Sequence, residues 1–197
     1  MDEIVKAAMA RWPDVPAVYG WLGLSARGEW KIRGEPIANA SIREFIGRNY
    51  ASDDQGNWFF QNGPQRVFVS LEATPFIYRL DSLGHLQAHT GARPRELRAA
   101  FADPEGRLFL QTEFGPGLVD SQDTAQFAER LVDARGLQLD EHGLGRWSRG
   151  EGGAFVETDG LGLRHDDGGR VPLAHVAAGR WAESFGFVAQ PGGGRIS

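Results

Sequence analysis

The 197-residue chain carries 26 acidic and 21 basic side chains, a formal net charge of −5 at pH 7, and 41% of its residues are hydrophobic. This composition is ordinary for a globular protein and lacks the basic excess that a nucleic-acid-binding protein needs. The chain contains no cysteine, which excludes disulfides and zinc–thiolate sites and fits a reducing cytoplasm. No stretch reaches the roughly 20 apolar residues of a membrane-spanning helix, and no signal-peptide pattern is present. We therefore expect a cytoplasmic protein with neither nucleic-acid nor membrane partners.

The N-terminal part predicts a helix, a hairpin and a second helix. Apolar residues recur at helical spacing over residues 2–11. Short apolar runs at 18–24 and 30–32, separated by a Gly-containing turn, predict a β-hairpin. A capping box then starts a short helix, with Ser41 as the N-cap and Glu44 three residues later.

The centre of the chain, from Ser52 to Leu80, contains three apolar runs closed by turn residues. Aromatic content and alternation predict strands at 58–60, 66–72 and 76–80. Because Asn62-Gly63 is followed by a proline, we expect a loop longer than two residues between the first two strands. The three runs together predict a three-stranded antiparallel meander.

The second half of the chain alternates strand and helix signals. Strands are predicted at 97–102, 108–110, 118–119, 146–148, 154–158, 161–164 and 170–173. Helices are predicted at 123–135, which Gly136 would end, and at 174–184.

One short pattern occurs twice. Asp53 begins an Asp-x-x-Gly turn that is followed by an aromatic strand and a glutamine, and Asp103 begins the same pattern. The repeat indicates either an internal structural duplication or the chance recurrence of a common turn. We expect an α+β fold of two small antiparallel-sheet units with short helices packed on them. The expected units are residues 1–81 and 82–190, followed by a flexible tail at 191–197.

The candidate ligand-binding residues gather around the second and third central strands. They are polar side chains set among apolar ones: Gln61, Asn62, Gln65, Arg66 and Arg79. Arginine presents a fixed fork of donors to carboxylate or phosphate groups, and the neighbouring amides could complete a site for a small polar or anionic molecule. The alternative is that these residues form the solvated face of a sheet, with Glu72 and Asp81 as ion-pair partners.

A metal site has weaker support. Asp81, His85 and His89 are the one group with ligand-like spacing, but a strand would hold the two histidines about 13 Å apart, too far to share an ion. No nucleophile elbow and no phosphate-binding glycine fingerprint is present. We expect no catalytic residues, no metal and no cofactor.

Several segments resemble two families of unknown function. The words WLGLSARGEW, FIGRNY and GNWFFQNGPQRVFVSLEATPF are similar to a small family of uncharacterised proteobacterial proteins, over about residues 19–131. A second, more distant resemblance rests on Trp30, Gly34, Pro36-Ile37, the turn from Asp53 to Gly56, and the strand that leads to Phe76; Thr74 departs from that pattern. The second resemblance implies two related α+β units and a role in ligand binding or signalling.

These observations favour a non-enzymatic small-molecule-binding or regulatory protein, with a small polar or anionic ligand or a protein partner. The alternatives are an enzyme of unassigned class, such as a metal-assisted hydrolase that uses His85 and His89, and a structural subunit of a larger complex.

Overall fold

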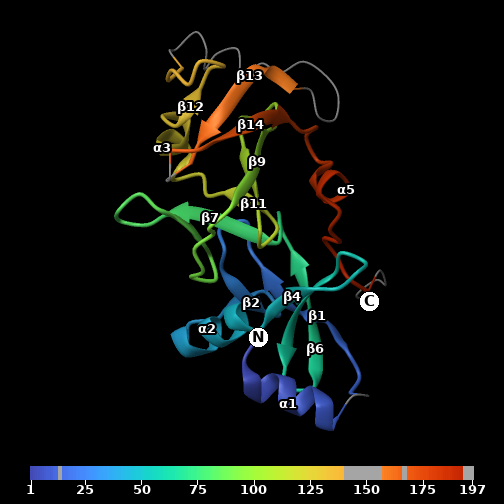
Figure 1. Cartoon of the computed structure of the whole chain (residues 1–197). Coiled ribbons are helices and arrows are strands. Elements are labelled where there is room, and N and C mark those ends of the chain that lie inside the picture. Colours follow the sequence, from blue (N-terminus) through green and yellow to red (C-terminus); the bar gives the residue numbers. More distant parts are fainter. Residues whose placement is uncertain (13–14, 140–156, 166–167, 193–197) are drawn as a thin grey trace. The chain divides into compact units, whose positions relative to one another are not determined.

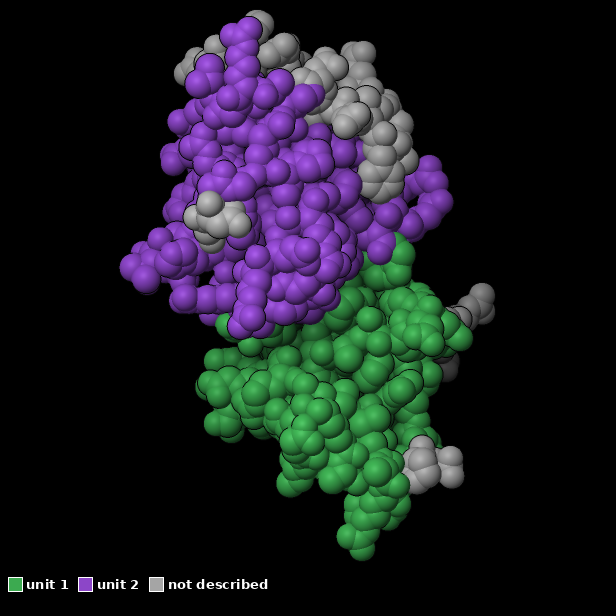
Figure 2. Space-filling model, viewed as in Figure 1, with its two compact units in different colours: residues 1–75, 89–91, 186–197 green, residues 76–88, 92–185 purple. Residues whose placement is uncertain are grey.

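The computed structural model describes residues 1–12, 15–139, 157–165 and 168–192. They form two compact units, each built on one β-sheet (Figures 1 and 2). The first unit contains residues 1–75 and 89–91, and the described segment 186–192 also belongs to it; the second contains residues 76–88 and 92–185. The second unit thus begins at Phe76 rather than at residue 82, and the chain returns to the first unit at Gly186.

The first unit contains a six-stranded sheet in the order β3-β2-β1-β6-β5-β4. Its strands are β1 (Val18–Leu24), β2 (Trp30–Ile32), β3 (Glu35–Pro36), β4 (Tyr50–Ser52), β5 (Trp58–Asn62) and β6 (Gln65–Leu71). The predicted hairpin is confirmed, because β1 and β2 pair antiparallel. The C-terminal segment is tied to this unit, since the amide of Leu71 donates to the carbonyl of Ala189 (2.8 Å) and that of Val188 to Gly56 (2.9 Å).

Two helices complete the first unit. Helix α1 (Glu3–Arg11) lies at the end of the sheet where β1 and β6 begin (Figure 1). Helix α2 (Ala40–Arg48) packs its Phe45 edge-to-face on Phe60 of β5, with ring centroids 5.5 Å apart. The N-cap of α2 is Asn39, whose side chain accepts from the amide of Ile42, so the predicted cap at Ser41 was two residues late.

The second unit contains an eight-stranded sheet in the order β12-β13-β14-β9-β10-β11-β7-β8. Its strands are β7 (Phe76–Leu80), β8 (Leu86–Ala88), β9 (Leu97–Ala102), β10 (Leu108–Thr112), β11 (Pro116–Val119), β12 (Leu131–Val132), β13 (Glu157–Arg164) and β14 (Arg170–His175). Two short helices accompany it, α3 (Thr124–Ala128) and α5 (Trp181–Phe185). The predicted strand at 146–148 and the first part of that at 154–158 lie outside the described residues.

The predicted antiparallel meander was wrong in its third strand. β5 and β6 form the expected hairpin, and Asn62 pairs with Gln65, so the loop has two residues and is shorter than expected. β7, however, pairs with β8 and β11 in the other sheet. The sheets are also mixed rather than antiparallel, because β1 pairs parallel with β6, β7 with β11, and β9 with β14. The coarser α+β assignment holds.

Both helices predicted in the second half were too long. The helix expected at 123–135 ends at Ala128, because Leu131 and Val132 pair with β13 as a strand. In the segment 174–184, Ala174 still belongs to β14, and the helix is confined to α5.

One turn structure recurs five times in the part of the chain that the structure describes. The turns begin at Ser25, Asp53, Asp81, Asp103 and Asp133. In each, the first residue's side-chain oxygen accepts from the amides two and four positions later. Glycine follows at the fourth position with φ between 78° and 81°, which side-chain-bearing residues rarely adopt. The Asp-x-x-Gly signal therefore marks a real local structure.

Five strands of each sheet share one arrangement. The order β2-β1-β6-β5-β4 and the order β8-β7-β11-β10-β9 have the same sequence of antiparallel, parallel, antiparallel and antiparallel pairs. The turn at Ser25 joins β1 to β2, and the turn at Asp81 joins the equivalent strands β7 and β8. The turn at Asp53 joins β4 to β5, and the turn at Asp103 joins the equivalent strands β9 and β10.

Candidate functional site

A pocket of about 380 Å³ lies within the first unit, between helix α2 and strands β1, β2, β5 and β6. We call it the α2 pocket. It is lined by Val18, Trp21, Leu22, Ile32, Ile42, Ile46, Phe60, Asn62, Gln65 and Val67. Asn62 and Gln65 contribute amide groups, and the other side chains are apolar. The volume falls in the range of small-molecule sites, which are mostly apolar with a few placed polar groups.

Regular spacing places these side chains together. In a strand, every second residue faces the same side, so Phe60 and Asn62 of β5 share a face. Their register partners, Val67 and Gln65 of β6, share it too. On α2, Ile42 and Ile46 are four residues apart and project from one side of the helix toward the pocket.

The pocket has a closed floor and an open mouth. Leu22, Ile46 and Phe60 are buried. Trp21, Ile32 and Ile42, by contrast, are 49%, 45% and 45% exposed. Half-exposed apolar side chains forgo part of the free energy that full burial would provide. A group of such side chains on one surface marks a binding site in many proteins.

The structure places two of the five predicted site residues in this pocket. Asn62 and Gln65 line it, and the Gln65 Nε2 also donates to the Pro16 carbonyl (3.2 Å). The sequence did not predict the apolar lining, because strands β1 and β2 and helix α2 are brought together only by the fold. The one local indication of this lining was the alternation of Val67, Val69 and Leu71 in β6, which predicts an apolar face on that strand.

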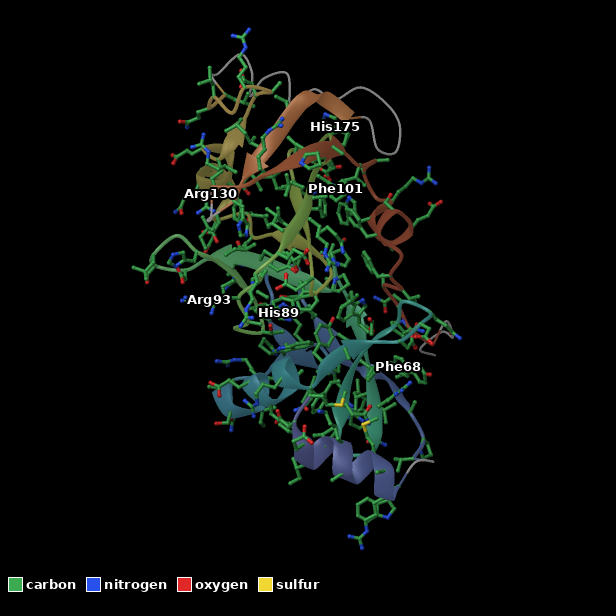
Figure 3. All side chains as sticks on the ribbon, in the orientation of Figure 1. Phe68, His89, Arg93, Phe101, Arg130 and His175 are labelled. Carbon is green, nitrogen blue, oxygen red and sulfur yellow. The ribbon has the colours of Figure 1, made fainter. Side chains whose placement is uncertain are left out.

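Gln61 and Arg66 face the other side of the same sheet. The Arg66 guanidinium lies over the ring of Phe59, 4.6 Å from its centre. Phe68, labelled in Figure 3, shares that face and stacks on Tyr19 with ring centroids 4.6 Å apart. Gln61 is buried, and its Nε2 donates to the Gly63 carbonyl (2.9 Å). These two residues therefore cannot act together with the pocket amides on one small ligand.

Arg79, the fifth predicted residue, belongs to the second unit. Its guanidinium pairs with the buried carboxylate of Asp120 at 2.8 Å. Glu72, considered above as an ion-pair partner for the arginines, binds Lys31 instead at 2.8 Å. The hydrogen bond from Lys31 lowers the pKa of the Glu72 carboxyl.

The residues of the metal hypothesis are divided between the units. Asp81 and His85 belong to the second unit and His89 to the first. Hydrogen bonds from the backbone of His85 and Leu83, together with nearby Arg93, lower the pKa of Asp81, so this carboxylate is already occupied as a turn cap. His89 is half-buried beside the rings of Trp30 and Tyr50. Among the residues that the structure describes, no group of three or more His, Asp or Glu is arranged to hold a metal ion.

Comparisons with known proteins give a family and a fold. The model of the DUF2944 family, whose description reads "Protein of unknown function (DUF2946)", matches residues 1–192, and no curated protein matches. A solved DUF1285 family protein from Silicibacter pomeroyi DSS-3 is 13% identical with a TM-score of 0.53, over 88% of this chain and 96% of that one. A DUF1285 family protein from Shewanella baltica OS155 is 16% identical with a TM-score of 0.43, over 54% of this chain and 88% of that one.

These findings confirm the resemblance to a family of uncharacterised proteins, and they are consistent with the second family of unknown function. At such low identity, the Silicibacter protein shows a shared fold alone. Among the helices that are described, none is long and apolar enough to cross a membrane.

Proposed function

The chain belongs to the DUF2944 family, whose members have no known function, and from this premise we propose that it is a non-enzymatic small-molecule-binding or regulatory protein whose ligand occupies the α2 pocket. One observation carries the proposal: an apolar pocket of about 380 Å³ opens through half-exposed Trp21, Ile32 and Ile42 and contains the amides of Asn62 and Gln65. The ligand is then largely apolar with a polar group, whereas the sequence led us to expect a small polar or anionic molecule. The cytoplasmic location expected from the cysteine-free sequence is part of this proposal.

The test uses N-phenyl-1-naphthylamine, an uncharged dye whose fluorescence rises when it leaves water. We expect saturable binding to the native protein and at least about tenfold weaker binding to Val67→Phe, because the larger side chain fills the pocket; tenfold corresponds to about 1.4 kcal/mol. Thermal unfolding of each variant verifies the fold.

The matched control is Arg66→Phe, which places the same ring one position earlier on the same strand and hence on the opposite face. This variant should bind the dye as the native protein does. Loss of binding in Arg66→Phe with full binding in Val67→Phe would move the site to the face of Gln61 and Arg66 and contradict the proposal.

We further propose that the two units arose by internal duplication. The shared order and pairing senses of five strands support it, as do the equivalent turns at Ser25 and Asp81 and at Asp53 and Asp103.

A further inference from the structure

We infer that the α2 pocket selects ligands that carry a negative charge on an apolar body, and that Arg33 binds the charged group. This inference rests on the proposed function, because it concerns the same pocket. None of the side chains that line the pocket is charged, so selection by charge has to come from its mouth.

Arg33 is fixed beside that mouth. It follows the pocket residue Ile32 at the end of β2, and its amide donates to the carbonyl of Trp21 at 2.8 Å. Its guanidinium carbon lies 3.7 Å from the centre of the Trp21 ring, a cation–π contact with a side chain that lines the pocket. A guanidinium stacked in this way keeps its N–H donors in the plane available for an anion.

No described residue neutralises this charge. Arg33 is exposed and forms no ion pair within the resolved ranges of the chain. The next arginine along the chain, Arg43, is occupied differently, since its Nη1 donates to the carbonyls of Ile37 and Ala38. A stacked but unneutralised guanidinium next to an apolar pocket is complementary to an amphipathic anion.

The backbone at Arg33 supplies an independent argument. Arg33 and Gly34 form the two-residue turn between β2 and β3, with φ of 50° and 88°. Both central residues of such a turn have positive φ, and Asn-Gly is the favoured pair because asparagine tolerates this conformation better than other side chains. Arg33 is the only non-glycine residue with positive φ in the described ranges. Unfavourable backbone conformations of this kind concentrate at functional sites, and here the use of the side chain explains why an arginine occupies the position.

The test compares two dyes that share one ring system. 1-Anilinonaphthalene-8-sulfonate is N-phenyl-1-naphthylamine with an added sulfonate, so the ratio of their dissociation constants measures the preference for the anion. At about 0.15 M salt, where distant charges are screened, we expect the native protein to bind the anionic dye about tenfold more tightly, equivalent to about 1.4 kcal/mol.

The decisive variant is Arg33→Asn, which suits the turn better than arginine does. We expect it to unfold at the same or a higher temperature and to bind the uncharged dye as before, while the preference for the anionic dye disappears. The control Arg66→Asn makes the same change of charge on the opposite face and should keep the preference.

The outcomes separate the two proposals. Binding of the uncharged dye with an anion preference that persists in Arg33→Asn would overturn the role of Arg33 and leave the pocket intact. Failure of the native protein to bind the uncharged dye would overturn the proposed function and this inference with it.

Discussion

Replacing Asp103 by alanine is expected to lower the free energy of unfolding by about 3 kcal/mol. The carboxylate is fully buried at the head of the turn between β9 and β10. Its Oδ1 accepts from the amides of Glu105 (3.0 Å) and Arg107 (2.9 Å), and its Oδ2 binds the Arg107 Nε at 2.6 Å. The alanine variant leaves these donors unsatisfied in a place that water reaches poorly, and urea unfolding measures the loss.

The matched control for Asp103 is Asp133→Ala. Asp133 makes the same two amide hydrogen bonds, to Arg135 and Leu137, at an exposed turn of the same unit. Water can replace the lost acceptor there, so a loss of about 1 kcal/mol is expected. Asp103→Asn keeps an acceptor oxygen and should fall between the two. Equal losses in the two alanine variants would show that burial of the carboxylate and its arginine contribute nothing.

Alanine at Gly117 is expected to destabilise the protein by about 3 kcal/mol, at the upper end of the usual range for overpacking. Gly117 lies in β11, and a Cβ there would come within 2.3 Å of the Tyr78 ring and 2.8 Å of the Phe76 carbonyl oxygen. The ring has no room to retreat, because Tyr78 is fully buried and its hydroxyl is 2.7 Å from the Thr112 Oγ1. Thermal unfolding followed by circular dichroism measures the effect.

Gly23→Ala in β1 is the control for Gly117. A Cβ there meets nothing closer than the Ser70 carbonyl oxygen at 3.5 Å, an ordinary contact. Because alanine also restricts the unfolded chain, this variant should be neutral or slightly stabilising. If the two variants unfold at the same temperature, Tyr78 moves aside more readily than its contacts indicate.

Sequence patterns predicted local structure well where one turn chemistry determines it. The strand after the Asp53 turn and the strands on both sides of the Asp103 turn were predicted correctly, since each turn needs only an acceptor side chain and a glycine three residues later. The turn at Asp133 carries the same signature, but the apolar spacing of Phe127, Leu131 and Val132 favoured a helix across it. Spacing of this kind fits a helix or a strand over so few residues, and pairing with β13 decided between them.

Partners distant in sequence could not be predicted. The strand from Phe76 follows the β5–β6 hairpin closely, yet it joins β11 instead, and no local property of the strand encodes that choice. The same holds for the site. Asn62 and Gln65 were predicted from their polar character among aromatic residues, but their apolar neighbours come from α2 and β1. Arg33 had a local signal, an Arg-Gly pair between two short strands, which points to a turn and not to a ligand.

The return of the chain to the first unit at Gly186 links the folding of the two units. The second unit, which lies within residues 76–185, is an insertion in the first, because the chain belongs to the first unit both before residue 76 and after residue 185. In the unfolded chain this insertion is a long flexible segment between two parts of the first unit. Closing a loop costs more entropy the longer the flexible chain within it. When the second unit folds, it shortens the flexible part of that loop and so favours the docking of Val188 and Ala189. On the ribosome the same connection imposes an order, because the first sheet can be made early but acquires its last backbone partners only when residue 189 has emerged.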